Sequence, residues 1–242
     1  MSILQSRFSA TIIFGLACGF LLLDAHAKKR WLAGDHHVHS QYSVGWDDST
    51  IPPTPIPGGD AINPIPRNVD LGQKYGLSWM VTTDHGGPNH SKLNRDQAYP
   101  ELVASRASYP DILQFYGMEL NTPGADHSSL IIPRTDDERN VLLEIEGGFD
   151  KYEAFPQDPS RDTEAHMLEA LSLMRDLPSP PLLIANHPSR SARMYGKYGL
   201  HSPKEFRAWN NLAPDVAIGM AGAPGHQAVS YTHLTLPTSD LV

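Results

Sequence analysis

Apolar and polar residues alternate along this chain in short runs that predict strands and helices in turn. Several runs are short and rich in apolar or β-branched residues, as expected of strands: 31–35, 77–83, 112–118, 128–132, 182–185 and 216–220. Other runs have helical spacing or helix-start signals: 67–75, 96–108, 162–177 and 202–210. Strands that alternate with helices predict βα units around a mainly parallel sheet or barrel.

The segments between these runs differ in character. The clearest helix is 162–177, where Met167, Leu171 and Met174 fall on one face. The segment 51–66 holds too many prolines for regular structure and predicts a loop. The segment 138–150 is acidic, and we expect it to be a solvated excursion from the fold.

The two ends of the chain are expected to lie outside the folded domain. An apolar run at 10–23 is followed by Ala25-His26-Ala27, which is the layout of a secretory signal peptide cleaved after Ala27. This predicts a periplasmic or secreted protein. The segment 230–242 shows no helical or strand period, and we interpret it as a non-native or disordered tail. The domain would then span residues 28–229.

The amino-acid composition limits the classes of ligand that the chain is expected to bind. Apolar residues make up 40% and charged residues 19% of the chain, which suits a globular core. The formal net charge of −8 argues against a general nucleic-acid or membrane-surface binder, although a small phosphorylated substrate remains compatible with it. Twelve histidines stand against one cysteine, so nitrogen and oxygen ligands would hold any bound metal.

The first motifs are two histidine clusters at predicted strand ends. In an extended strand His37 and His39 share a face, so both imidazoles can bind one metal, with Asp35 orienting a ligand ring. The alternative is a polar strand end with surface histidines. Asp84 and His85 directly follow the strand 77–83, where the alternative is a turn with an incidental histidine.

Further along the chain, three more strand ends carry similar residues. Glu119 closes the strand 112–118 and can bridge two cations, or can simply end the strand in solvent. His127 lies at the start of the strand 128–132, where a lone histidine is usually structural or at the surface. His187 follows the strand 182–185 in Asn186-His187-Pro188, which favours a ligand. Two arginines follow, either to hold an anionic substrate oxygen or as ordinary surface residues: Arg190 and Arg193. We expect His90, His166 and His201 to be structural or surface residues.

Together these clusters predict a metal site at the carboxyl ends of the strands. In βα barrels that edge is where catalytic residues gather. A histidine-rich site with a bridging carboxylate suits two or three divalent cations, which would be zinc, manganese or iron. Such cations suit phosphoester hydrolysis by activated water. We therefore expect a small phosphorylated substrate, such as a nucleotide or short oligonucleotide. No protein partner and no membrane span in the mature chain are inferred.

The ordered motifs resemble those of the polymerase and histidinol phosphatase (PHP) family of metal-dependent hydrolases. The matching motifs are Asp35-x-His37-x-His39, Thr83-Asp84-His85, Gly117-x-Glu119, His127 and Asn186-His187-Pro188. The resemblance implies a distorted seven-stranded (β/α)7 TIM-like barrel of α/β class. It also implies His37, His39, His85, Glu119, His127 and His187 as metal ligands. We expect Asp84 and Glu119 to act in catalysis.

The chain departs from this pattern in two places. The family places an Asp or His soon after its first motif, where Asp47 or Asp48 is only an approximate match. A closing Asp-x-His motif is missing, which suggests an incomplete barrel and a truncated chain that is itself inactive; whether His226 joins the site stays open. Two alternatives to a phosphoesterase are a metallohydrolase of a non-phosphate bond and a metal-binding module without turnover.

Overall fold

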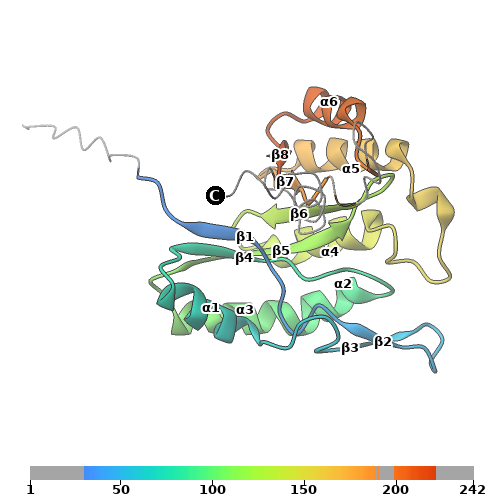
Figure 1. Cartoon of the computed structure of the whole chain (residues 1–242). Helices are drawn as coiled ribbons and strands as arrows, with labels where there is room; N and C mark the ends of the chain where they lie inside the picture. Colours follow the sequence, from blue (N-terminus) through green and yellow to red (C-terminus); the bar gives the residue numbers. More distant parts are fainter. Residues whose placement is uncertain (1–29, 189, 191–198, 222–242) are drawn as a thin grey trace, which may run out of the picture. The chain divides into compact units, whose positions relative to one another are not determined.

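A six-stranded mixed sheet forms the centre of the structure, a computed structural model that describes residues 30–188, 190 and 199–221 (Figure 1). The strands lie in the order β1 (Gly34–Val38), β4 (Trp79–Thr82), β5 (Leu113–Asn121), β6 (His127–Ile132), β7 (Leu182–Ala185) and β8 (Ala217–Met220). All belong to one compact unit that begins at Leu32. The predicted signal peptide, the predicted tail, Arg193 and His226 lie outside the described residues.

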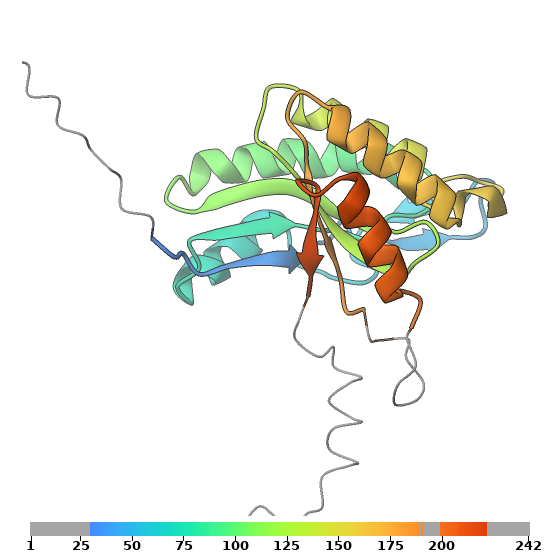
Figure 2. The same ribbon diagram turned by 90° about the horizontal axis from the view of Figure 1, so that it is seen from above.

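The expected (β/α)7 barrel is wrong. Among the described strands the sheet is a curled, open one, with β1 and β8 at its two ends (Figure 2). Strand β6 runs antiparallel to both β5 and β7, whereas β1, β4 and β5 are parallel to one another. The reason is the short connection between β5 and β6, residues 122–126. A parallel crossover needs about a dozen residues, so this loop can only turn the chain back.

Helices pack against the sheet in neighbouring pairs: α1 (Ile65–Lys74) with α3 (Tyr99–Ser108), α4 (Glu138–Phe149) with α5 (Glu164–Asp176), and α5 with α6 (Pro203–Leu212). A short α2 (His90–Leu93) leads through a π-helical turn, 94–98, into α3. In the described part of the chain, no helix combines the length and apolarity that a bilayer crossing requires. The helices predicted at 67–75, 96–108, 162–177 and 202–210 are confirmed within a few residues.

The helix starts and buried faces follow from local sequence. Ser202 and Glu205 form a reciprocal capping box at the start of α6, with Pro203 in its first turn. In α5, Met167 and Leu171 are fully buried, as their spacing predicts. Burying side chains of this size contributes about 1.5–3 kcal/mol each, which fixes the face that α5 turns to the sheet.

Two sequence expectations about connecting segments are wrong. The acidic segment 138–150 is mostly helix α4, because Leu142 and Ile145 are fully buried on its inner face. The proline-rich segment 51–66 contains a short strand, β3 (Thr54–Ile56), which pairs with β2 (Gly45–Asp47) in a two-stranded antiparallel sheet. The segment also includes the first residues of α1.

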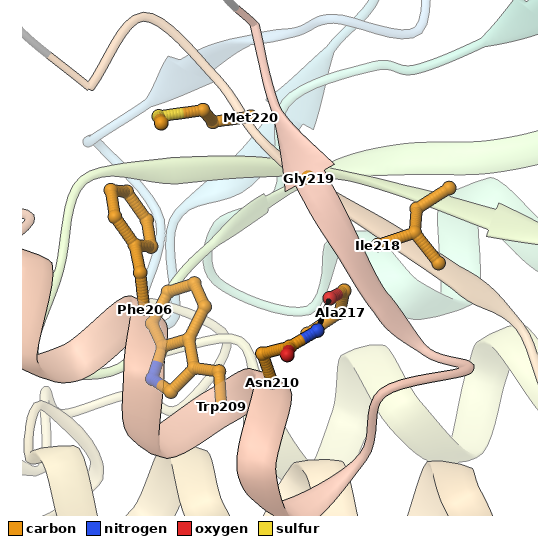
Figure 3. A pocket seen from close by; sticks show the side chains of 7 residues that line it. All are labelled: Phe206, Trp209, Asn210, Ala217, Ile218, Gly219 and Met220. Atoms are coloured by element: carbon orange, nitrogen blue, oxygen red, sulfur yellow. Dashed lines mark hydrogen bonds between the residues drawn. The ribbon is translucent and has the colours of Figure 1, made fainter.

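A small apolar groove lies between α6 and β8, at one end of the described sheet. Phe206 and Trp209 on the helix face Met220 and its neighbours on the strand (Figure 3). The side-chain amide of Asn210 donates a hydrogen bond to the carbonyl of Ala217, 3.3 Å away, and so ties the helix to the strand. Nothing in this groove belongs to the histidine clusters.

A buried ion pair anchors α2 to α4. The ring of His90 is fully buried; Nδ1 lies 2.5 Å from a carboxylate oxygen of Glu146, and Nε2 lies 2.8 Å from the carbonyl of Tyr42. Burial by itself lowers the pKa of His90. The negative charge of Glu146 and these hydrogen bonds outweigh that effect and raise the pKa to about 9.

This pair predicts a pH-dependent stability. Because the folded-state pKa of His90 exceeds its ordinary value of 6.5, its stabilisation is complete below about pH 6.5 and is lost as pH rises through about 9. The variant His90→Gln leaves Glu146 buried without its partner, which costs about 3–5 kcal/mol. In urea unfolding, we expect His90→Gln to have a lower free energy of unfolding than wild type at pH 7. Between pH 7 and 9 its free energy of unfolding should decrease less than that of wild type.

A half-buried histidine on α5 supplies a matched control. His166 has a side chain that is 20% exposed and contacts Glu169 at 3.4 Å. The variant His166→Gln should keep the wild-type slope of stability against pH. Equal slopes for His90→Gln and wild type between pH 7 and 9 would contradict the assignment.

Candidate metal centre

The predicted metal-binding residues meet at one edge of the sheet. Strands β1, β4, β5 and β7 run in one direction and present there the residues at their carboxyl ends. Strand β6 runs the other way, so it presents its first residue at the same edge. The residues brought together are His37, His39, His85, Glu119, His127 and His187.

Glu119 is the centre of the cluster, and its side chain is only 1% exposed. Its Oε2 atom lies 3.3 Å from His37 Nε2, 3.4 Å from His39 Nε2 and 3.1 Å from His85 Nε2. Its other oxygen, Oε1, lies 3.4 Å from His127 Nδ1 and 2.9 Å from His187 Nε2. Each carboxylate oxygen therefore faces its own set of imidazoles.

The imidazoles form a ring around this carboxylate. Successive ring centroids are 4.9 Å apart from His37 to His39, 4.7 Å from His39 to His85, and 4.9 Å from His85 to His127. The circle closes with 5.4 Å from His127 to His187 and 6.0 Å from His187 to His37. Such a circle presents many nitrogen lone pairs to a small shared space.

The pKa values of the clustered side chains shift in different directions. Burial lowers the pKa of His85 to about 4 and also lowers the pKa of His39, so both rings are neutral at pH 7. Burial of Glu119 opposes its charge, but hydrogen bonds from His127, His187 and His37 hold its pKa well below its usual range. The same contact with Glu119 outweighs burial at His37 and raises its pKa.

A hydrogen-bonded chain fixes the bridging carboxylate from behind. The side-chain amide of Asn186 donates to Glu119 Oε1 at 3.0 Å, and its oxygen accepts from the hydroxyl of Ser129 at 2.9 Å. The ring of His36 lies 3.1 Å from that hydroxyl. Since His36 points away from His37 and His39 along β1, the alternation of the strand gives one histidine this supporting position.

His187 is held in an uncommon backbone conformation. Its φ is +28°, a region that residues with a Cβ seldom occupy. The Nδ1 atom of its ring is buried and has no hydrogen-bond partner within the described structure. A carboxylate oxygen, Oδ2 of Asp126, lies 3.9 Å away from it. A strained backbone and an unpaired buried ring atom coincide at the edge where the other imidazoles meet.

Four groups of side chains have the geometry to hold a metal ion. They are His37, His39 and Glu119; His39, Asp60 and His85; His85, Glu119 and His127; and Asp126, His127 and His187. In each group the ligand atoms lie within 4.8 Å of one another. Neighbouring groups share histidines or Glu119, so the site offers overlapping positions rather than one isolated position.

Sequence reasoning missed Asp60. It lies in the proline-rich segment, far from the histidine motifs in sequence, and reaches them because the carbonyl of Ser43 accepts its backbone N–H at 3.0 Å. The Ser43 hydroxyl donates to an Asp60 carboxylate oxygen at 3.1 Å. Asp47, one of the two residues left open, instead accepts from Ser49 at the surface. No local sequence signal distinguishes Asp60, because a tertiary contact places it.

Two predicted carboxylates have different positions from those expected. Asp84 is buried, and both its oxygens accept from Ser40, one from the backbone N–H and one from the hydroxyl. It therefore holds the loop after β1 in place; burial raises its pKa to about 6. Asp35 accepts from the backbone N–H of His37 at 2.9 Å, and not from an imidazole N–H as expected.

Arg190 lies at the rim of the centre and is already paired. Its guanidinium lies 2.6 Å from Asp126 Oδ1 and 3.3 Å from His127 Nδ1. Its side chain is 30% exposed, so one face remains open to solvent. The arginine is positioned beside the histidines, but it would bind a substrate oxygen in competition with Asp126.

Comparisons with known proteins yield no match, either to a family model or to a curated protein. The basis for a function is therefore the site itself. Five imidazoles and several carboxylates in these groups could together hold a metal ion.

The geometry predicts that these groups bind a metal ion, for which Co²⁺ serves as the probe. We expect His85→Ala to weaken Co²⁺ binding by at least about tenfold, because the ring contributes to more than one group of ligands. Isothermal titration of chelator-treated protein, with the visible absorption of bound Co²⁺ as a second signal, measures this effect.

His166→Ala is the control, since its ring contacts only the surface of α4 and α5. It should bind Co²⁺ as the wild type does. Equal affinity of His85→Ala and wild type would show that the histidine ring does not bind metal.

Proposed function

We propose that this protein is a metal-dependent phosphoesterase. The observation that carries the proposal is the division of imidazoles between the two oxygens of Glu119. His37, His39 and His85 face one oxygen, whereas His127 and His187 face the other. A carboxylate in this position suits a bridge between two cations, as in hydrolases that clamp the attacking and leaving oxygens of a phosphoester.

The residues fit such cations in kind and number. Two of the four overlapping groups contain Glu119, and the other two are His39, Asp60 and His85, and Asp126, His127 and His187. Zinc, manganese or iron suits these ligands best. The buried Nδ1 atom of His187 lacks a hydrogen-bond partner among the described residues and lies 3.9 Å from Asp126, which suits a nitrogen that binds a cation.

Bound cations would supply Lewis acidity toward a water molecule and a phosphoryl oxygen. The residues of the chain hold the reacting groups in place. Asn186 keeps the Glu119 carboxylate oriented, and Asp84 keeps the loop after β1 fixed through Ser40. In the reaction the water oxygen forms a bond to phosphorus, the ester P–O bond breaks, and the leaving oxygen takes a proton.

We further propose a small phosphorylated substrate. The net charge of −8 offers no basic track for long nucleic acid, whereas Arg190 provides one cationic group at the rim. A nucleotide or short oligonucleotide fits these limits. The ordered motifs resemble the PHP family, and the resemblance supports phosphoester hydrolysis although the sheet is not the family's barrel. The predicted signal peptide at 1–27 leads us to propose a periplasmic or secreted location as well.

The test is hydrolysis by protein that is first stripped with a chelator and then reconstituted. We expect Zn²⁺ or Mn²⁺ to restore turnover of an aryl phosphate. Glu119→Gln should lower kcat by at least about 100-fold, because bridged cations contribute several kcal/mol to the transition state. Thermal unfolding in parallel shows whether the variant stays folded.

Glu144→Gln is the matched control, since Glu144 is exposed on α4 and lies outside the ligand groups. It should retain full activity. Turnover of an aryl carbamate or carboxylic ester, with none of the phosphate, would favour a hydrolase of another bond. Tight metal binding without any turnover would favour a binding module. Activity in Glu119→Gln equal to wild type would refute the proposed bridging role.

A further inference from the structure

An aromatic cavity lies next to the candidate metal centre and is unused by the site described above. Its volume is about 380 Å³, within the range of small-molecule sites. Its lining comes from three segments: β2 with the turn that follows it, the loop after His85, and the loop after α4. The residues that define it are Trp46, Gly86, Gly87, Tyr152 and Phe155.

Part of the cavity lining directly follows a histidine of the candidate metal centre in the chain. Gly86 directly follows His85, whose Nε2 lies 3.1 Å from Glu119 Oε2. A Cβ at Gly87 would overlap the indole of Trp46, and a Cβ at Gly86 would overlap the Asp150 carboxylate. The glycines therefore let the backbone after His85 lie directly between these two groups.

The opposite wall is attached to the strand that carries Glu119. Asp150 accepts the backbone N–H groups of Asn121 and Tyr152, both at 2.9 Å. The backbone N–H of Lys151 donates to the carbonyl of Asn121 at 3.1 Å. Because Asn121 lies two residues beyond Glu119 in β5, these bonds tie the backbone of Tyr152 to the strand that carries the bridging carboxylate.

The lining favours an uncharged planar group. Tyr152 is 39% exposed and Phe155 is 43% exposed, so both offer ring surface that an occupant can cover. Asp48 is the one charged residue among those that line the cavity, and its sign disfavours an anion there. A phosphate would therefore bind at the histidines and leave the cavity for the rest of the molecule.

We infer that this cavity binds the planar ring of the ester's leaving group, which is either an aryl alcohol or a nucleoside with its base in the cavity. The connection to a leaving group rests on the proposed phosphoesterase function, whereas the affinity for a planar ring does not. Ring stacking on Trp46, Tyr152 and Phe155 would orient the ester bond beside His85. The cavity thus sets which phosphoesters are preferred.

The kinetic test compares substrates in the metal-reconstituted protein. We expect kcat/KM to be higher for phenyl phosphate or adenosine monophosphate than for glycerol 2-phosphate. The ratio of kcat/KM for the ring substrate to kcat/KM for glycerol 2-phosphate should fall about tenfold in the double variant Tyr152→Ala, Phe155→Ala, mainly through KM. Preference for one of the two ring substrates identifies an aryl group or a nucleobase. A ratio that stays unchanged in the double variant would overturn the inference.

Tyr75→Ala is the control, because Tyr75 is 77% exposed at the end of α1, outside the cavity. It should keep the wild-type ratio. Thermal unfolding checks that the double variant is folded. The milder variant Phe155→Leu keeps an apolar side chain without an aromatic ring, and it should lower the ratio by a smaller factor.

A binding test separates this inference from the proposed function. Saturation-transfer NMR of the metal-loaded protein uses phenol and adenosine, which carry no phosphate. Saturation in wild type that is lost in the double variant supports the cavity as a ring site even if no phosphoester is hydrolysed. Absence of saturation for both compounds, or saturation that the double variant keeps, would overturn the inference even if phosphoesters are hydrolysed.

Discussion

The arrangement of this protein depends on one buried negative charge. Glu119 is removed from water almost entirely, and a carboxylate there is tolerable only because imidazoles and an amide surround it. Those partners come from several strands, so the strands must be positioned closely relative to one another. The sheet, the loops and the supporting groups Asn186 and Ser129 all serve that convergence. Glu119 is therefore both the centre of the candidate metal site and the point at which the strand ends meet.

The reversal of β6 is part of how that convergence is achieved. A strand parallel to β5 would present its last residue at the metal edge, whereas the antiparallel β6 presents His127, its first. The short connection at 122–126 thus delivers a ligand next to Glu119 without an intervening helix. The same edge continues into the loop after His85, so the candidate metal centre and the aromatic cavity share that loop.

Much of the site is predictable because local sequence marks the strand ends. Apolar runs that stop at a histidine or a carboxylate indicate His37, His85 and Glu119 from the sequence alone. Tertiary features are not predictable in this way. Asp60 reaches the centre through hydrogen bonds to Ser43 that no sequence pattern records. The closed barrel is a wrong expectation because alternating elements do not reveal strand direction. Helix α4 is not predicted because its acidic residues indicate a solvated segment, although its inner face is apolar.

The dispersal of the ligands along the chain has a thermodynamic consequence. Residues as distant in sequence as His37 and His187 share one carboxylate only when the whole sheet has formed. An unfolded chain therefore lacks the site, and any free energy of metal binding is added to the stability of the fold by linkage. In a chain with a single cysteine, Cys18, the ions would serve as non-covalent cross-links between strands, in the role that disulfides play elsewhere.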